Sequence, residues 1–315
     1  MELYRSFDRV DPPDARGRVV TLGVFDGVHL GHREVLARTI TWAREIGARS
    51  AAITFDPHPA VVLGRSAPLR ILPAESRVEL FGELGIEEVF LVEFDTRLAD
   101  TPAEEFVQQV LLERLGVRGV VLGYDTRLGK GAAGDGEFLR RLGERMGFGV
   151  RIVEPVLVGG KPVKSTRVRD AIRSGDLALA TELLGRPPAA IGRVVAGAGR
   201  GRRIGHPTAN VDLEHDCLPP VGVYATRVRL GTFSGRPREA VTNVGRRPTF
   251  DGEDSPVSVE CHLLDFAGDL YGERLVVEFL DRIRGERKFS GPEELAAQIA
   301  RDAAWWSSRR RSRDG

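Results

Sequence analysis

Two histidines and three glycines lie close together in the stretch GVFDGVHLGH, residues 23–32. The apolar run RVVTLGVF at its start predicts a buried strand, and the residues after it carry apolar side chains at helical spacing. The stretch is therefore predicted to turn from a strand into a helix. Because the first N–H groups of a helix are unpaired and its dipole is positive at that end, such a turn favours binding of an anion such as phosphate.

His29 and His32 have three interpretations at this place. As hydrogen-bond donors, they would stabilise the charge that builds up on phosphoryl oxygens during displacement at phosphorus, and the glycines would let the phosphate approach the backbone. Alternatively, they cap the helix, or they bind a metal ion at H-x-x-H spacing with His58 of FDPHP as a third ligand. The spacing alone leaves all three open.

Up to about residue 185, short apolar runs alternate with helical patterns. Strands are expected at residues 48–55, 87–94, 117–124 and 148–155, and helices at residues 73–85, 101–116 and 134–147. Thr101 is the expected N-cap of the second of these helices, because Pro102 suits its first position. The alternation predicts an α/β domain with a doubly wound parallel sheet. Ligands bind outside the carboxyl ends of such strands, where His29, His58 and Asp125 are expected.

After Pro187 and Pro188 the pattern changes to closely spaced strands. These are expected at residues 191–197, 221–230, 238–245, 255–266 and 274–284, with a single clear helix at residues 291–306. Such an arrangement predicts an antiparallel β-barrel followed by a C-terminal helix. The predicted domains are therefore residues 1–186 and 187–303, with a disordered basic tail at residues 304–315.

The composition excludes several classes of protein. The chain has 315 residues, of which 42% are hydrophobic, and its 46 Lys and Arg residues nearly balance 45 Asp and Glu residues. With a net charge of +1, neither nucleic acid nor an anionic membrane is an expected partner. Cys217 and Cys261 are too few for a disulfide framework, and no apolar run approaches the roughly twenty residues of a spanning helix. A cytoplasmic protein is expected, and the oligomeric state stays open.

A second phosphate-binding cluster is expected in KSTRVRDAIRSGD, residues 164–176. Ser165, Thr166 and Arg169 open a predicted helix, so hydroxyls, backbone amides and a guanidinium are offered to one anion. Taken alone, such a segment is more often a helix N-cap with basic neighbours than a phosphate site, whereas its pairing with HLGH favours the phosphate site. Neither of the two phosphate-binding segments is a Walker loop or a G-x-G-x-x-G dinucleotide turn, and the G-x-S-x-G elbow does not occur in the sequence.

Several motifs together resemble a known family. GVFDGVHLGH with the later STRVR is similar to the nucleotidyltransferase signature. In the second half, five motifs stand in the order of a riboflavin kinase module: GRVVAGAGRGRRIGHPTANVDL, LPPVGVYATRV, TNVGRRPTF, VECHLLDFAGDLYG and RIRGERKF. From about residue 18 to 303 the chain thus resembles the bacterial bifunctional riboflavin kinase/FAD synthetase family. The resemblance implies a nucleotidyltransferase-type sheet followed by a riboflavin kinase-type barrel, and the ATP-dependent conversion of riboflavin to FMN and of FMN to FAD.

The resemblance also implies roles for residues of the first module. His29 and His32 would bind and stabilise the phosphates of ATP during AMP transfer to FMN, with Mg²⁺ spreading charge and no covalent intermediate. The same phosphates would be held from the opposite side by Ser165, Thr166 and Arg169. Further residues are assigned to the ATP site, namely Gly23, Asp26 and Gly31, and others to the flavin site, namely His58 and Asp125.

In the second module, Thr208 and Asn210 of PTAN would lie at Mg²⁺ and the ATP phosphates. Glu260 would take the proton from the ribityl 5′-hydroxyl as that group attacks the γ-phosphorus. The phosphate cover would include Gly199, Gly201 and Gly205, and the flavin pocket Asn243 and Thr249. Without the resemblance, Glu260 would be only a polar-face residue of a strand, and the glycine-rich stretch a hairpin turn with solvated arginines.

The chain departs from the family pattern at a few positions. Thr126 and Leu128 stand where the family usually has aromatic residues, Lys164 replaces a serine, and His206 replaces an aromatic residue. The first three put flavin affinity of the first module in question. Two alternatives therefore stay open: a riboflavin kinase with a weak or repurposed N-terminal module, and a non-catalytic flavin-binding regulator. A base and magnesium ligands argue against the regulator, since pure binding needs neither.

Overall fold

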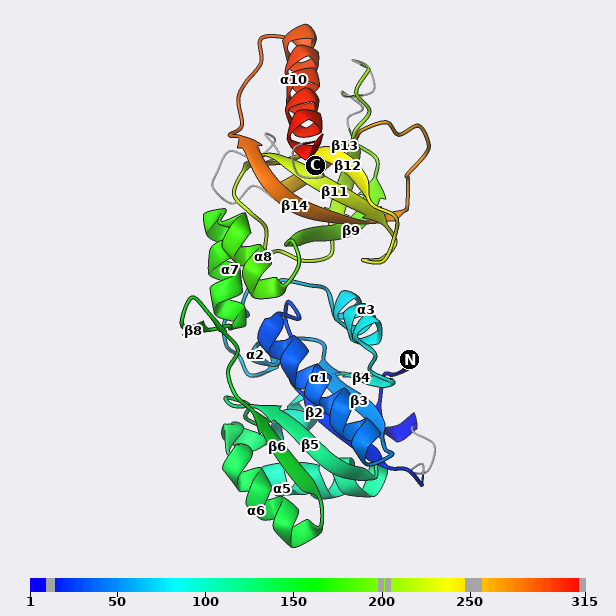
Figure 1. Ribbon diagram of the computed structural model, residues 1–315, viewed down its shortest axis with the longest axis vertical. Coiled ribbons are helices and arrows are strands. Elements are labelled where there is room, and N and C mark those ends of the chain that lie inside the picture. Colours follow the sequence, from blue (N-terminus) through cyan, green and yellow to red (C-terminus); the bar gives the residue numbers. More distant parts are fainter. Residues whose placement is uncertain (10–14, 198–200, 202–204, 247–256, 312–315) are drawn as a thin grey trace. The chain divides into compact units, whose positions relative to one another are not determined.

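The computed structural model describes residues 1–9, 15–197, 201, 205–246 and 257–311. The chain divides into two compact units, coloured along the sequence in Figure 1. The first unit comprises Met1–Leu69 and Ala74–Ser165, and the second comprises Arg70–Pro73 and Thr166–Gly315. The domain boundary near Pro187 remains a prediction.

The first unit is built on a six-stranded parallel sheet with the order β1-β4-β3-β2-β5-β6. Its strands are β1 (Glu2–Tyr4), β2 (Arg18–Leu22), β3 (Arg49–Phe55), β4 (Glu88–Val92), β5 (Val117–Gly123) and β6 (Gly149–Val153). Every residue of β2 and β4 is buried, as expected for strands covered on both faces. From β2 the chain proceeds to β3 on one side, whereas β5 pairs on the other side. This confirms the doubly wound sheet and places its switch point at β2 and β5.

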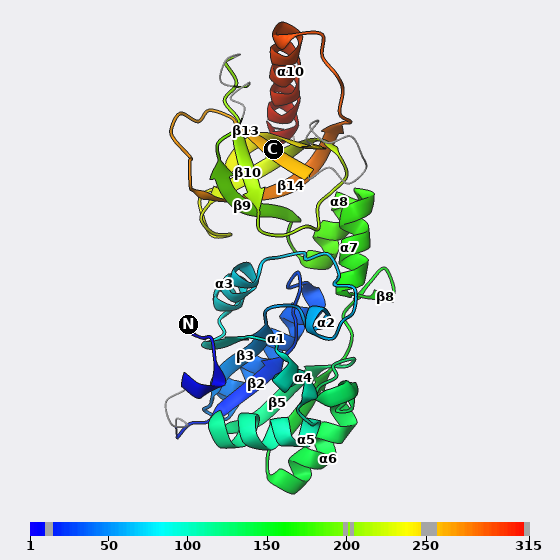
Figure 2. The same cartoon turned by 180° about the vertical axis from the view of Figure 1, so that it is seen from behind.

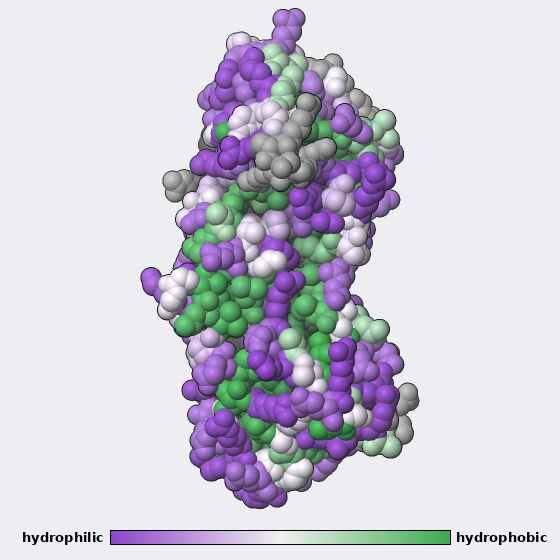
Figure 3. All heavy atoms as spheres, in the orientation of Figure 1, coloured by the Kyte–Doolittle hydropathy of each residue, from purple (hydrophilic) through white to green (hydrophobic). Residues whose placement is uncertain are grey.

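Helices cover both faces of this sheet (Figures 1 and 2). They are α1 (Leu30–Glu45), α2 (Pro59–Val62), α3 (Ala74–Leu84), α4 (Thr96–Asp100), α5 (Ala103–Glu105), its continuation η2 (Phe106–Arg114) and α6 (Gly136–Met146). Short turns and a hairpin complete the unit: η1 (Phe7–Arg9), η3 (Lys130–Ala132), β7 (Leu157–Val158) and β8 (Lys161–Pro162). Helix α6 buries Leu139 and Leu142, and Figure 3 shows hydrophilic residues over its outer side.

One predicted helix start is wrong. Pro102, rather than Thr101, is the N-cap of α5, and no side chain caps that helix. Thr101 instead ends α4, where its hydroxyl donates to the carbonyl of Arg97. The sequence pattern did not reveal α4, which ends at Asp100 with Thr101 as its C-cap.

The second unit is a closed antiparallel barrel with the strand order β10-β13-β12-β11-β14-β9, as predicted. Its strands are β9 (Ala189–Val195), β10 (Ala209–Leu213), β11 (Gly222–Leu230), β12 (Arg238–Arg246), β13 (Val257–Leu263) and β14 (Arg274–Arg284). Inward-facing residues alternate with outward-facing ones along β10 and β13 and fill the barrel core. The sequence analysis missed β10, and it gave the other five strands.

Within the described residues, the helices that accompany the barrel are α7 (Ser165–Ser174), α8 (Leu177–Leu184) and α10 (Pro292–Arg311). Residues 304–311, predicted to be a disordered tail, continue α10, so that prediction is wrong for this segment. Two contacts explain the order: Trp306 is buried, and Arg309 forms an ion pair of 3.0 Å with Asp281 of β14. Residues 312–315 lie outside the part that the structure describes. Among the helices described, none is long and apolar enough to cross a membrane.

Candidate active sites

The first candidate site is the turn between β2 and α1, at the switch point of the sheet. His29 is the N-cap of α1, and its Nδ1 accepts a hydrogen bond of 3.3 Å from the backbone N–H of His32. The two imidazole rings are stacked, with centroids 3.6 Å apart and planes 16° apart. Because Nδ1 of His29 is an acceptor, the ring proton lies on Nε2. His29 therefore caps the helix and would donate to a phosphoryl oxygen through Nε2.

The backbone of this turn is strained. Phe25 and Val28 have φ angles of 53° and 43°, and Gly27 between them has 85°. A left-handed conformation is rare for a β-branched residue such as Val28, and it persists only where surrounding contacts determine it. One such contact is the 3.0 Å hydrogen bond from the N–H of Val28 to the carbonyl of Phe25. Strain held in this way is typical of a preorganised functional site.

Several expected residues meet at this turn. The hydroxyl of Ser165 donates to the carbonyl of the buried Asp26 at 2.9 Å, which joins the start of α7 to the turn. A β-carbon added to Gly31 would lie 3.2 Å from Cε1 of His29, so the ring packs directly on the glycine backbone. Gly23 donates its N–H to the carbonyl of Ile53 and extends the sheet pairing. Two other expected residues, Thr166 and Arg169, lie further along α7 in the second unit.

The other expected residues of this site follow β3 and β5. His58 caps the four-residue helix α2, and its Nδ1 accepts from the N–H of Ala60 at 3.1 Å. Asp125 forms an ion pair of 2.9 Å with Lys164, whose ammonium also lies 5.2 Å from the centroid of the Tyr124 ring. The hydrogen bond that Lys164 donates to Asp125 raises the pKa of Lys164 above its ordinary value. Within the described ranges, no group of three His, Cys, Asp or Glu residues could hold a metal ion.

The second candidate site is a row of polar residues across three strands of the barrel. Asn210 of β10 is directly opposite Glu260 of β13, and Glu260 is directly opposite Asn243 of β12. Residues paired in this way project from the same face of the sheet. All three are partly exposed, whereas Val259 and Cys261 on either side of Glu260 are buried in the core. Strand register thus places the expected base between two amides on the outer face of the barrel.

Two glycines lie against the expected magnesium ligands. A β-carbon on Gly201 would lie 3.1 Å from Oγ1 of Thr208, and one on Gly197 would lie 2.1 Å from the Asn210 amide nitrogen. Only glycine allows the backbone to approach these side chains so closely. Gly205 has a φ of 79° and is exposed. Two other expected residues, Gly199 and Thr249, lie outside the residues that the structure describes.

His262 of β13, which the sequence analysis did not single out, contacts the turn formed by residues 205–208 before β10 (the Thr208 turn). Its Nδ1 lies 2.9 Å from the carbonyl oxygen of Pro207, and its Nε2 lies 3.3 Å from Nδ1 of His206. Because a carbonyl only accepts, Nδ1 of His262 carries the proton and Nε2 accepts from His206. Burial and the neighbouring His262 lower the pKa of His206, which favours the neutral form of His206.

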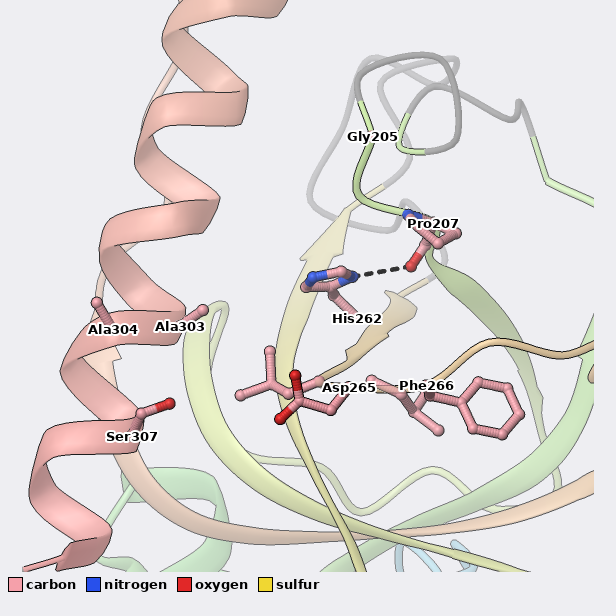
Figure 4. A pocket seen from close by; sticks show the side chains of 10 residues that line it. Gly205, Pro207, His262, Asp265, Phe266, Ala303, Ala304 and Ser307 are labelled. Atoms are coloured by element: carbon pink, nitrogen blue, oxygen red, sulfur yellow. Dashed lines mark hydrogen bonds between the residues drawn. The ribbon is translucent and has the colours of Figure 1, made fainter.

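A cavity of about 360 Å³ borders the Thr208 turn (Figure 4). Pro207 and His262 line one side of it, and Ala303, Ala304 and Ser307 of α10 line the other. The small side chains of α10 leave the space open, as Figure 4 shows. The cavity therefore extends the second candidate site from the barrel toward the C-terminal helix.

Comparison with known proteins matches each half of the chain to a family model. The family model for FAD synthetase matches residues 11–167, and that for riboflavin kinase matches residues 184–308. A bifunctional riboflavin kinase/FMN adenylyltransferase from Pseudomonas fluorescens is 40% identical over 305 residues, covering 96% of each chain. The protein of the same name from Bacillus subtilis strain 168 is 38% identical over 289 residues, covering 90% of each. The chain belongs to this bifunctional family.

A solved structure has the same fold as this family member. It is described as a macrolide-efflux protein from Streptococcus pneumoniae, and it is 32% identical, with a TM-score of 0.81. The similarity covers 96% of this chain and 97% of that one. The likeness therefore extends over both the sheet and the barrel.

The sequence analysis missed one residue, Glu286, that lies beside the row of Asn210, Glu260 and Asn243. Glu286 follows β14, and its Oε1 would lie 2.5 Å from a β-carbon on Gly245. The same β-carbon would lie 2.9 Å from the Asn243 amide nitrogen. Only the folded barrel shows this, because Glu286 follows β14 whereas Asn243 is on β12, and their sequence separation gives no periodic signal.

Proposed function

We propose that this chain phosphorylates riboflavin to FMN with one ATP and adenylylates FMN to FAD with a second, releasing pyrophosphate. Membership of the bifunctional family supports both activities. The observation that carries the kinase half is the row Asn210–Glu260–Asn243, which sets a carboxylate between two amides. The observation that carries the other half is the stacked histidine pair at the sheet's switch point.

In the kinase step, Glu260 accepts the proton of the ribityl 5′-hydroxyl. The freed oxygen attacks the γ-phosphorus of ATP, the new P–O bond forms, and ADP leaves as the bond to its β-phosphate oxygen breaks. The amides of Asn210 and Asn243 flank Glu260 in register and orient the groups that meet there. A carboxylate suits this role because the acceptor is an alcohol beside a phosphate of high negative charge.

The donor set beside Glu260 fits magnesium. Thr208 supplies a hydroxyl oxygen and Asn210 an amide oxygen, which are the hard ligands that Mg²⁺ takes together with water and phosphate oxygens. Gly197 and Gly201 bring backbone close to both side chains, and so restrict how they can turn. When bound, the ion would neutralise charge on the β- and γ-phosphates.

In the adenylylation step, an oxygen of the FMN phosphate attacks the α-phosphorus of ATP. A phosphoanhydride bond forms between FMN and AMP, and the bond to pyrophosphate breaks. No general base is needed, because the attacking phosphate is already deprotonated near neutral pH. His29 and His32 donate hydrogen bonds as charge builds up at phosphorus, and Ser165, Thr166 and Arg169 bind the phosphates from α7. The flavin is held near His58 and Asp125.

Incubating the purified protein with riboflavin and Mg·ATP, and separating the flavins by chromatography, tests both activities. FMN should form first and FAD should follow. FMN that accumulates without FAD would leave the chain a riboflavin kinase with an idle or repurposed first module. The absence of any new flavin would favour the alternative of a flavin-binding regulator.

A further inference from the structure

A buried arginine lies behind the strained turn of the first site. Arg77 on α3 is 5% exposed, and its guanidinium donates to three neutral oxygens of the sheet. Nη1 donates to the carbonyl of Val24 and to the Thr54 hydroxyl, the latter at 2.8 Å, and Nη2 donates to the carbonyl of Phe55 at 3.0 Å. Because the guanidinium is a rigid fork, it fixes these acceptors relative to one another.

These acceptors belong to the carboxyl ends of two neighbouring strands. Thr54 and Phe55 end β3, and Val24 lies two residues beyond the end of β2. The Thr54 hydroxyl also donates to the carbonyl of Val24 at 3.1 Å, which links the two strand ends directly. The chain that leaves β2 carries His29 and His32, so Arg77 holds the backbone from which both histidines project.

The same helix contacts the turn at a second point. Phe81 lies four residues after Arg77 and therefore on the same face of α3. Its ring meets that of Phe25 edge-on, with centroids 5.3 Å apart, and the Phe25 ring meets His32 edge-on at 5.2 Å. Helix α3 thus contacts the backbone of the turn directly, and the imidazole of His32 through the Phe25 ring.

We propose that Arg77 is a positioning residue for adenylylation. By holding the carbonyl of Val24, it maintains the left-handed backbone at Phe25 and Val28, and so keeps the two imidazoles aimed at the reacting phosphates. The inference rests on the proposed function of the first site. Misplaced hydrogen-bond donors reduce stabilisation of the transition state more than they reduce binding of the substrates. Loss of Arg77 therefore affects kcat more than KM.

Arg77→Lys is the main test, because lysine keeps the positive charge but cannot hold three acceptors with a rigid fork. We expect adenylylation kcat to fall about 10- to 100-fold, the loss typical of a misplacement near 1 Å, while KM for FMN and for ATP changes less than about threefold. Arg77→Met should lower kcat further. Riboflavin phosphorylation by the same protein is the internal control and should not change.

Arg18 offers a matched control. It is also buried in the first unit, 2% exposed, but it lies at the opposite end of β2, where it pairs with Glu88 at 2.7 Å. Arg18→Lys should lower the melting temperature and leave adenylylation kcat unchanged in the folded protein. If Arg77→Lys behaves in the same way, Arg77 is only structural and the proposal is wrong.

Two further measurements test the role of Arg77 independently. Should Arg77→Met fail to fold, Phe81→Leu removes the second contact of α3 and should also lower kcat selectively; unchanged kcat would contradict the proposal. The side-chain ¹⁵N signals of His29 and His32 report the turn without turnover, and they should shift in Arg77→Lys but not in Arg18→Lys. A wild-type protein that forms no FAD overturns the proposed function, whereas an active wild type with an unaffected Arg77→Lys overturns the inference alone.

Discussion

The two candidate sites are built in different ways. The first depends on an irregular turn, with φ angles of 53° at Phe25 and 43° at Val28, supported by contacts from α3 and α7. The second depends on regular strand pairing, which sets Asn210, Glu260 and Asn243 in one row without unusual backbone. The first site should therefore respond to distant substitutions that alter support of the turn. The second should respond mainly to changes of the row itself.

The largest effect is expected from substitution of Glu260 in the second site. Glu260→Gln removes the base while nearly preserving shape, and riboflavin phosphorylation should fall by about 10² to 10⁴. FAD formation from supplied FMN should be unchanged. Asp212→Asn is a matched control, because Asp212 is on the same outer face of β10 two residues from Asn210. A Glu260→Gln protein that phosphorylates riboflavin at the wild-type rate would exclude Glu260 as the base.

At the first site, substitution of the histidines should affect only adenylylation. His29→Ala or His32→Ala should lower it by about 10² to 10³, by analogy with loss of one donor from an oxyanion hole. Because His29 also caps α1, His29→Asn is informative, since asparagine is a good N-cap and keeps the helix start while removing the Nε2–H donor. It should be as inactive as His29→Ala but more stable to heat. Inhibition by a zinc chelator in excess Mg²⁺ would instead favour the metal interpretation.

The sequence predicted the parts that depend on periodicity. The parallel sheet, five of the six barrel strands and the positions of His29, His58 and Asp125 after strand ends all followed from apolar patterns and turn residues. The short β10 was missed because ANVDL follows a run of turn-forming residues and has only two strongly apolar positions. Pairing with β13 and β9 on either side, rather than intrinsic propensity, makes this segment a strand.

Other features depend on contacts between distant residues, and no local pattern carries them. The row of Asn210, Glu260 and Asn243 needs the strand register, which a sequence without pairing information does not give. The helical end of α10 depends on burial of Trp306 and on the Arg309–Asp281 ion pair, whereas the sequence shows only a basic run. The support of the first turn by Arg77 was likewise invisible in the sequence.

Fragments of the second unit test how much α7 and α8 stabilise the barrel. The predicted domain 187–303 omits α7 and α8, yet Leu177 of α8 is 6% exposed and packs in the barrel core. Loss of one buried leucine typically costs about 2 to 5 kcal/mol. A fragment of residues 166–315 should therefore melt at a higher temperature than one of residues 188–315, and both should phosphorylate riboflavin when folded. Equal melting temperatures, or a folded fragment 166–315 that forms no FMN, would contradict this division.

Thr126 and Leu128 test whether the family's aromatic positions wall the flavin pocket of the first site. Leu128 is 7% exposed and packs in the hydrophobic core of the first unit, so Leu128→Phe should overpack this core, at a cost of about 1 to 3 kcal/mol, and lower the melting temperature. Thr126 is partly exposed, so Thr126→Phe should lower KM for FMN by about two- to twelvefold, the equivalent of an aromatic contact of 0.5–1.5 kcal/mol. If Leu128→Phe lowers KM and leaves stability unchanged, the core assignment is wrong.

The smallest effect is expected at Lys164, where the first site has a cation in place of the family's serine. Its ion pair with Asp125 joins two side chains that are 50% and 54% exposed, so the pair should contribute little to stability. A cation just before the first turn of α7 is unfavourable toward the helix dipole, which argues that it does not serve the helix. An attraction of exposed charges of about 0.2 to 1 kcal/mol toward the FMN phosphate corresponds to roughly a 1.4- to 5-fold change in affinity.

Lys164→Gln should therefore raise KM for FMN by that factor at low salt and leave the melting temperature unchanged. The difference from wild type should shrink as ionic strength rises, because salt screens exposed charges. Lys161→Gln on β8 is the matched control; an equal rise in KM there would show that only the general positive field matters and not the place of Lys164.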